Sequence, residues 1–298
     1  MPFDLVTILG PTASGKTSIA AKLATKINGE IISADSRQVY LGMDIGTGKD
    51  LIEFQKNNVK YHLIDIVEPN EEYNVFRFTK DFQSSFELIK NAGKFPVLVG
   101  GSGLYLSAVL QSYHLPTVTE FKSGNLENMS LPELKEMLIK LKPKLHNVTD
   151  LKSKERLMQA ILIEQSRNRS DKKAFNLNSL NIGIKLSRDE IKSRITERLK
   201  SRLSNGMIEE VKTLLQKGIT HEKLNFFGLE YKFISLHLKG ELNYNDMFQK
   251  LNSSIHTFAK RQMTWFRKME REGVEINWFH PDQYDDIENF VISKLNNA

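Results

Sequence analysis

A glycine-rich segment near the N-terminus restricts the fold of this chain more than any other feature. Residues 10–17 read GPTASGKT and match the pattern G-x-x-x-x-G-K-[ST], whose backbone N–H groups surround a phosphate. The apolar segment 3–9 in front of it is typical of a buried strand, and residues 16–27 carry apolar side chains at helical spacing. Strand, loop and helix in this order indicate a polyphosphate-binding loop in an α/β fold.

The residue types of this phosphate loop each serve anion binding. Glycines at two positions let the backbone curl around an anion, and the helix that follows adds the positive end of its dipole. Lys16 can reach terminal phosphate oxygens, and Thr17 is placed to bind Mg²⁺. A ligand-free glycine-rich turn is the alternative, and the loop alone does not distinguish ATP from another polyphosphate. The residues predicted to bind the phosphates are Gly10, Pro11, Thr12, Ala13, Ser14, Gly15, Lys16 and Thr17.

The chain divides into three predicted regions. Up to residue 112, short apolar strands alternate with helices, which predicts a parallel sheet flanked by helices in a P-loop NTPase-like arrangement. Residues 113–178 lack a convincing buried strand and predict a helical insertion. Residues 179–298 return to the sheet and then become mostly helical. The expected strands are 3–9, 31–33, 95–99, 181–186 and 274–279, and the expected helices are 16–27, 104–109, 131–141, 156–164, 188–203, 207–217, 228–238, 245–271 and one at the C-terminal end.

Positive charge is concentrated in the second half of the chain. Residues 1–150 carry 16 Lys and Arg against 17 Asp and Glu, a net charge of −1, whereas residues 151–298 carry 26 against 19, a net charge of +7. A basic half favours a polyanionic partner, most often a nucleic acid. Well-solvated lysine-rich helices are the alternative interpretation.

Composition excludes several other classes of protein. The 298 residues include no cysteine, so disulfides, thiolate metal sites and cysteine nucleophiles are ruled out. No apolar run reaches the roughly 18 residues that a membrane-spanning helix needs. The N-terminus lacks the basic segment of a signal peptide. We therefore expect a cytoplasmic protein without membrane contact.

Asp35 follows a predicted strand and is a candidate for acid–base chemistry. In a parallel sheet, a carboxylate at that strand end lies near the phosphate loop, where it can bind Mg²⁺ through water or accept a proton from a nucleophile. A helix N-cap is the alternative role. Further small polar segments follow at 44–49, 62–65 and 100–105, and each is a weak signal by itself.

In order and spacing, these segments resemble the tRNA dimethylallyltransferase family, also called tRNA isopentenyltransferases. The matching segments are GPTASGKT (10–17), ADSRQVY (34–40), GMDIGTGK (42–49), HLID (62–65), VGGSGLY (99–105) and AKRQMTWFR (259–267). The resemblance implies transfer of a dimethylallyl group from dimethylallyl diphosphate to the exocyclic amino nitrogen of the adenosine 3′ of the anticodon in tRNA, with release of diphosphate. The phosphate loop would then hold a prenyl diphosphate and Mg²⁺ instead of a nucleotide.

The resemblance also implies roles for single residues. Asp35 matches the general base, while Lys16 and Mg²⁺ on Thr17 would stabilise the departing diphosphate. The insertion and the basic C-terminal region would hold the anticodon stem-loop of tRNA. Ser102 can additionally serve as a helix cap. The residues implied in tRNA binding are Asp35, Ser36, Arg37, Gln38, Ser102, Arg156, Gln159, Lys260 and Arg261.

Several departures from the family pattern lie in the segments expected to bind tRNA. Gln159, Asn225 and His256 stand where the family typically carries arginine, and Leu229 replaces a tyrosine. Neighbouring lysines do not reproduce the bidentate contacts of a guanidinium group. We therefore expect a divergent member, such as a second copy in its genome, in which tRNA affinity and substrate range differ more than the diphosphate chemistry.

Three other functions are consistent with parts of the sequence. An adenylate isopentenyltransferase would prenylate free adenine nucleotides, but it would not need the basic second half. A small-molecule P-loop kinase would bind and hydrolyse ATP. A catalytically weakened RNA-binding protein would explain the missing arginines. We also expect a monomer. Phe258, Trp265 and Phe266 lie at helical spacing, so we expect them in the hydrophobic core.

Overall fold

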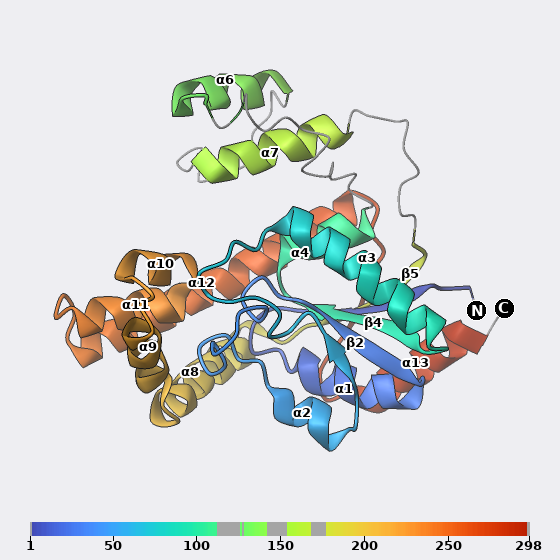
Figure 1. Ribbon diagram of the computed structural model, residues 1–298. Coiled ribbons are helices and arrows are strands. Elements are labelled where there is room, and N and C mark those ends of the chain that lie inside the picture. Colours follow the sequence, from blue (N-terminus) through green and yellow to red (C-terminus); the bar gives the residue numbers. More distant parts are fainter. Residues whose placement is uncertain (1, 112–125, 127, 142–153, 168–176, 297–298) are drawn as a thin grey trace.

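A parallel β-sheet forms the centre of the molecule (Figure 1). The computed structural model describes residues 2–111, 126, 128–141, 154–167 and 177–296. Within these residues, six strands lie in the order β3-β2-β4-β1-β5-β6, and every neighbouring pair is parallel. The strands are β1 Leu5–Leu9, β2 Gly29–Ala34, β3 Tyr61–His62, β4 Phe95–Gly100, β5 Ser179–Ile184 and β6 Asn277–Phe279.

Helices cover both faces of this sheet. α1 and α13 pack on one face, α3, α4 and α12 pack on the other, and α8 to α11 gather beside the carboxyl ends of the strands (Figure 1). The helices are α1 Lys16–Lys26, α2 Leu51–Lys56, α3 Val75–Asn91, α4 Gly103–Leu110, α6 Leu131–Leu141, α7 Lys154–Arg167, α8 Arg188–Ser204, α9 Met207–Gln216, α10 His221–Phe226, α11 Leu229–Leu238, α12 Tyr244–Arg271 and α13 Tyr284–Asn296.

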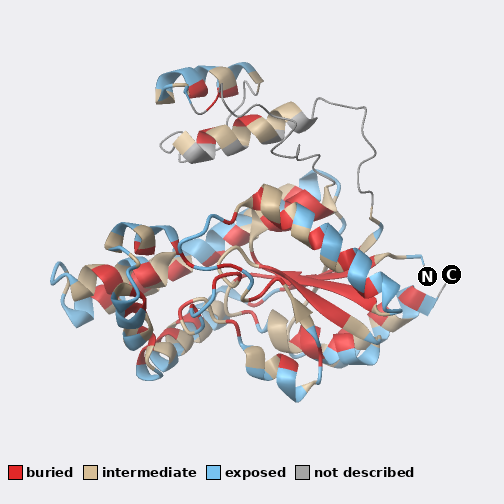
Figure 2. Cartoon of the chain, viewed as in Figure 1, coloured by how far each residue is buried: buried red, intermediate tan, exposed pale blue. Residues whose placement is uncertain are grey.

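Alternating side chains of the sheet fill two hydrophobic cores. In β1, Leu5 and Leu9 belong to the core beneath α3, α4 and α12, while Val6 and Ile8 belong to the core beneath α1 and α13. All four side chains are fully buried, and Figure 2 shows the strands as the buried centre of the chain. Because both faces are covered, the sheet is a rigid support for the loops at its ends.

The carboxyl ends of β1, β2 and β4 bring three loops to one edge of the sheet. Leu9 pairs with Gly100, and Gly100 pairs with Ala34, so the residues that follow these strands begin side by side. A Cβ atom at Gly100 would lie 2.3 Å from the carbonyl oxygen of Ala34, so only glycine permits this approach. The phosphate loop, the segment that starts at Asp35 and the loop before α4 therefore share this edge.

α6 and α7 pack against each other around a separate small core. Leu134, Leu138, Leu157 and Ile161 are buried in it. Helices are therefore present at 131–141 and 156–164, as the sequence pattern predicts. The predicted start of the insertion at residue 113 lies outside the described residues, so the limits of this region stay a prediction.

The sequence prediction of a P-loop NTPase-like α/β fold is confirmed, and most predicted elements are present within a few residues. The sequence pattern did not predict α2, β3, α3 and α10. β3 has two residues and α2 and α10 have six each, too few to produce a periodic pattern. α3 is missed although Phe78, Phe82 and Phe86 recur along its buried face. Among the described helices, none combines the length and hydropathy that crossing a bilayer requires.

A buried lysine fixes a loop that lies next to the shared edge. Lys49 is 2% exposed, and its Nζ donates to the carbonyl oxygen of Tyr40 at 2.9 Å and to the carboxylate of Asp44 at 2.5 Å. It also forms an ion pair with Asp65. The two weak sequence segments 42–49 and 62–65 therefore form one network of charges, and this network is structural.

We expect Lys49→Met to lower the free energy of unfolding by about 3 kcal/mol, because the substitution leaves a buried carbonyl and a half-buried carboxylate without their donor. Lys60→Met is the matched control, since Lys60 is exposed and lies 3.6 Å from Glu30; its cost should be about 0.5 kcal/mol or less. Urea unfolding of both variants measures the difference. Equal costs would contradict the structural role given to Lys49.

Candidate functional site

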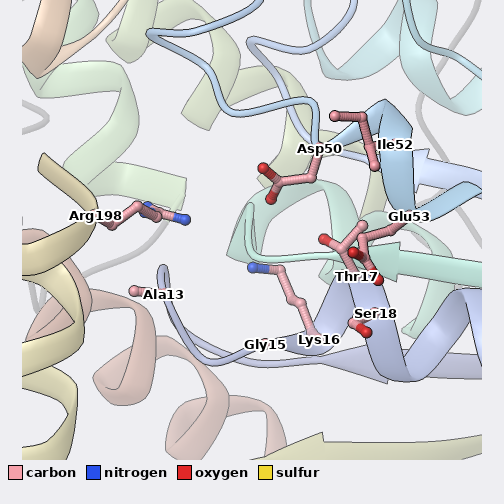
Figure 3. Close-up of a pocket in the computed structure, with 9 residues that line it drawn as sticks. All are labelled: Ala13, Gly15, Lys16, Thr17, Ser18, Asp50, Ile52, Glu53 and Arg198. Atoms are coloured by element: carbon pink, nitrogen blue, oxygen red, sulfur yellow. The ribbon is translucent and has the colours of Figure 1, made fainter. Parts of the chain in front are cut away.

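The phosphate loop forms one side of a cavity of about 400 Å³ (Figure 3). The chain enters α1 at Gly15, whose φ of 87° favours glycine, and the N–H of Ser14 donates to the carbonyl oxygen of Pro11 at 3.3 Å. The curled backbone thus leaves the N-terminus of α1 facing the cavity, as an anion site requires. The cavity is lined by Ala13, Gly15, Lys16, Thr17, Ser18, Asp50, Ile52, Glu53 and Arg198.

A second cation reaches this cavity from α8. Arg198 donates a hydrogen bond to Oγ1 of Thr12, and Figure 3 shows its side chain on the opposite side of the cavity from Lys16. Sequence reasoning missed Arg198. A signal was present, because Arg194, Arg198 and Arg202 repeat every four residues and therefore share one face of α8. The structure places that face toward the phosphate loop, since a Cβ atom at Gly15 would lie 3.6 Å from Arg194.

Both cations of the cavity have lowered pKa values. Burial, and then the nearby charge of Arg198, lower the pKa of Lys16 to about 8, while Asp35 and Asp50 act in the opposite direction. Burial and the charge of Arg202 lower the pKa of Arg198 to about 10. Positive charge held in a buried site at such a cost is relieved by an anion. The site therefore fits a ligand with several negative charges.

Asp35 directly follows β2 and begins a tight turn. Its Oδ1 accepts a hydrogen bond from the N–H of Arg37 at 2.9 Å, and no helix begins there, so the helix-cap alternative is wrong. The N–H of Ser36 donates to Oγ of Ser102 at 3.2 Å. Ser102 is the N-cap residue of α4 by position, but its side chain caps no helix N–H and instead binds the Asp35 turn (residues 35–38).

The remaining residues of the Asp35 turn are fixed by side-chain contacts. Gln38 accepts a hydrogen bond from Ser33 at 3.0 Å and donates to the carbonyl oxygen of Gly48 at 2.9 Å. The guanidinium carbon of Arg37 lies 4.6 Å from the ring centroid of Phe226, an exposed aromatic side chain at the end of α10. The predicted residues 35–38 and Ser102 are therefore brought together at one place.

The loop after Tyr40 is held by a carboxylate from α9. Glu210 accepts hydrogen bonds from the N–H groups of Asp44, Ile45 and Gly46 at 2.6–3.0 Å and from the hydroxyl of Tyr231 at 2.7 Å. Three consecutive backbone N–H groups aimed at one anion form a nest. The chain fills this nest with its own side chain.

The residues at the cavity fit a magnesium ion that also binds the ligand. Thr17, Asp50 and Glu53 present oxygen atoms around Lys16 (Figure 3). In the described part of the chain, no cluster of three or more His, Cys, Asp and Glu side chains could hold a metal. Mg²⁺ usually keeps several waters and takes few protein ligands beside substrate phosphates. Thr17 lines the cavity, which is compatible with an ion shared with the ligand, and its role as a metal ligand stays a prediction.

Along α12, basic residues face solvent beside a buried polar residue. Lys260 and Arg261 are exposed, whereas Gln262 is 7% exposed and contacts both the phosphate loop and the loop before α4. Sequence reasoning assigned no role to Gln262.

The aromatic residues of α12 differ in burial from one another. Phe266 is fully buried, and Trp265 packs against the core and donates to Oγ of Ser107 at 2.8 Å. Phe258 is 39% exposed, so its prediction as a core residue is wrong. It lies outside the row of buried residues that α12 packs against the core. Arg156 and Gln159 lie on α7, but their side chains are outside what the structure describes.

Known sequences match nearly the whole chain. The family profile described as IPP transferase matches residues 38–269, and the profile described as Isopentenyl transferase matches residues 3–66. A protein named tRNA dimethylallyltransferase 1 from Geotalea uraniireducens is 52% identical over 95% of this chain and 94% of its own. A protein named tRNA dimethylallyltransferase 2 from Bacteroides fragilis is 48% identical over 98% of each chain.

Solved structures show the same fold. The full-length tRNA isopentenylpyrophosphate transferase of Bacillus halodurans superposes with a TM-score of 0.72 at 32% identity, over 98% of this chain and 96% of its own. A eukaryotic dimethylallyltransferase acting on tRNA superposes with a TM-score of 0.73 over 93% of this chain and 74% of its own. At 24% identity, that second likeness concerns the fold alone.

Diphosphate binding should depend on the charge of Lys16. Since the pKa of Lys16 is lowered to about 8, the free protein loses this charge as pH rises through that value. We expect the affinity of the wild type for inorganic diphosphate to fall about fivefold from about pH 7 to pH 9, relative to Lys16→Arg, which keeps its charge. Isothermal titration calorimetry of both proteins measures the ratio, and the ligand's own titration cancels. A constant ratio would contradict the lowered pKa.

Proposed function

The chain belongs to the tRNA dimethylallyltransferase family, and we propose that it transfers a dimethylallyl group from dimethylallyl diphosphate to the exocyclic amino nitrogen of the adenosine 3′ of the anticodon in tRNA. One observation carries the proposal. A cationic cavity shaped for phosphates follows β1 and the carboxylate of Asp35 follows β2, and both lie at the same edge of one sheet, on either side of β4. The cavity fits a donor that carries a diphosphate, and the carboxylate fits an acceptor that must lose a proton. We call these two places the donor half and the acceptor half of the site.

The donor half binds the leaving group. Lys16, Arg198 and the N–H groups of the phosphate loop hold the diphosphate and stabilise the negative charge that grows as the carbon–oxygen bond breaks. The hydroxyl of Thr17 would hold Mg²⁺, which would supply further positive charge to the leaving diphosphate. Because these groups are fixed by α1 and α8 before the substrate arrives, little reorganisation is needed at the reaction.

The acceptor half removes a proton. The amino nitrogen forms a bond to the prenyl carbon, the carbon–oxygen electron pair leaves with diphosphate, and the proton passes from nitrogen to the carboxylate of Asp35. An aromatic amine is too weak an acid to be deprotonated beforehand, so the transfer accompanies bond formation. The N–H of Arg37 holds the carboxylate by one oxygen and leaves the other for the proton.

The tRNA surface adjoins the acceptor half. Ser36, Arg37, Gln38 and Ser102 surround the place where the base must enter, and a base in the anticodon loop must leave its stack to reach it. Lys260 and Arg261 offer exposed positive charge for backbone phosphates. We include the insertion in this surface, with Arg156 and Gln159 on α7. We further propose that the protein is a monomer and acts in the cytoplasm.

The central experiment supplies two acceptors. The protein is incubated with dimethylallyl diphosphate, Mg²⁺ and either unmodified tRNA with an adenosine next to its anticodon or AMP, and prenyladenosine is measured by mass spectrometry after digestion. Product with tRNA alone supports the proposal. Product with AMP alone would favour an adenylate isopentenyltransferase, and ATP hydrolysis without product would favour a kinase.

Replacing Asp35 should separate catalysis from binding. We expect Asp35→Asn to lower kcat at least about 100-fold, the usual share of a general base, with tRNA affinity within about twofold of the wild type. The amide oxygen of asparagine can still accept from the N–H of Arg37, so the turn is kept. Single-turnover rates and filter binding measure the two quantities. An unchanged rate, or a large loss of tRNA affinity, would show that Asp35 is not the base.

The exposed cations of α12 should contribute to the salt dependence of tRNA binding. For Lys260→Ala with Arg261→Ala, we expect the slope of log affinity against log salt to become less steep by about 1 to 2. Each lost phosphate contact means that roughly one counterion fewer is released on binding.

The control is Lys22→Ala with Lys294→Ala, two exposed lysines on α1 and α13 at the opposite face of the sheet. Their loss changes the net charge equally and should leave the slope unchanged. An equal slope change in both double variants would mean that only overall charge matters.

A further inference from the structure

Gln262 is a polar residue in a buried apolar stripe. The stripe of α12 runs through Ile255, Ala259, Phe266 and Met269, and Gln262 lies within it at 7% exposure. A buried amide needs partners for both its oxygen and its nitrogen, because an unpaired polar group in the interior is costly. The hydrogen-bond partners of Gln262 therefore indicate its role.

Both ends of this amide bind loops of the candidate site. Its Oε1 accepts a hydrogen bond from the N–H of Thr12 at 2.8 Å, and its Nε2 donates to the carbonyl oxygen of Gly101 at 2.8 Å. One partner is a donor and the other an acceptor, so the orientation of the amide is fixed. A Cβ atom at Gly101 would lie 2.6 Å from Nε2, so glycine is needed for this contact.

The two contacts lead to the two halves of the site. On one side, Thr12 belongs to the phosphate loop, and its hydroxyl accepts from Arg198. On the other side, Gly101 precedes Ser102, whose hydroxyl accepts from the N–H of Ser36 next to Asp35. A single side chain thus stands between the diphosphate cavity and the acid–base carboxylate.

We propose that Gln262 is a positioning residue that sets the separation between the phosphate loop and the Asp35 turn. This inference rests on the proposed prenyl transfer and adds a residue to it. The prenyl carbon is held from the diphosphate side and the amino nitrogen from the Asp35 side, so their alignment depends on how the two loops are held. Small errors in such alignment slow a reaction strongly without weakening either substrate's binding by the same factor.

Each half of the amide has a separate task. The oxygen holds the N–H of Thr12 and so fixes the phosphate loop before diphosphate binds. The nitrogen holds Gly101 and, through Ser102, the Asp35 turn. A methionine at this position keeps the approximate length and volume but makes neither hydrogen bond. A glutamate keeps an acceptor for Thr12 and places its second oxygen against the carbonyl oxygen of Gly101.

The test compares Gln262→Met with Gln262→Glu in the full chain. For Gln262→Met we expect kcat for tRNA prenylation to fall at least about tenfold with the KM for tRNA within about twofold, and the Kd of inorganic diphosphate with Mg²⁺ to rise about threefold or more. For Gln262→Glu we expect the same loss of kcat, but a diphosphate Kd within about twofold of the wild type, because the contact to Thr12 is kept.

Asn252→Leu is the matched control. Asn252 lies on the same helix, and its amide accepts from Thr196 on α8 at 3.1 Å without contacting the phosphate loop. The substitution removes a partly buried amide that bonds a neighbouring helix, so it should change stability without changing kcat or the diphosphate Kd. Urea unfolding measures the free energy of unfolding of all three variants, so their stabilities can be compared.

Two results would overturn the proposal. One is a Gln262→Met enzyme whose kcat and diphosphate Kd both stay within about twofold of the wild type. The other is a loss of kcat in Asn252→Leu as large as that in the Gln262 variants, which would make the role one of general stability. If the wild type forms no prenyladenosine, the proposed function fails, and the transfer-dependent positioning role falls with it. The diphosphate Kd values then still decide whether Gln262 fixes the phosphate loop.

Discussion

The close approach of β4 to β2 at Gly100 determines where the chemistry can take place. Parallel pairing of β1, β4 and β2 ends all three strands at one level, and the absence of a side chain at Gly100 lets the carbonyl of Ala34 lie against it. The phosphate loop, the Asp35 turn and the loop before α4 leave the sheet from this edge. Everything assigned to donor and acceptor is carried by those three loops or by helices that contact them.

Charge is then arranged around that edge in two different ways. At the cavity, burial and the charge of Arg198 lower the pKa of Lys16, and burial and the charge of Arg202 lower the pKa of Arg198, which keeps the site ready for an anionic ligand. Next to it, Lys49 is neutralised by Asp44 and Asp65 and serves the backbone of Tyr40. Lys16 is partly buried and has no ion pair among the described residues, whereas Lys49 is fully buried and has two. That difference separates a binding residue from a structural one.

The sequence was sufficient for the fold class and for the residues that lie in continuous motifs. The phosphate loop, residues 35–38 and Ser102 are found as short segments after predicted strands, and they meet because parallel strands end at one edge. Arg198 and Gln262 were missed for a physical reason. They come from α8 and α12, and their approach to Thr12 spans 186 and 250 residues of sequence. Helical periodicity places them on a face but does not say what that face meets.

Local patterns also misjudged individual side chains. The spacing of Phe258 on α12 is that of a core residue, but the buried stripe runs through Ile255 and Ala259 and leaves the ring of Phe258 39% exposed. Asp35 and Ser102 have the residue types of helix caps, and neither caps a helix: Asp35 accepts from Arg37 in its own turn, and Ser102 accepts from Ser36 of that turn. Propensity is a weak guide where tertiary hydrogen bonds are available.

The nest closed by Glu210 bears on which ligands the protein can accept. Residues 44–46 offer three backbone N–H groups in an arrangement that suits a phosphate as well as a carboxylate. Since Glu210 fills that nest and is itself held by Tyr231, a mobile anion would have to displace a tethered one. A phosphate of an RNA backbone lying across this surface would therefore meet the carboxylate of Glu210 at residues 44–46 instead of free N–H groups.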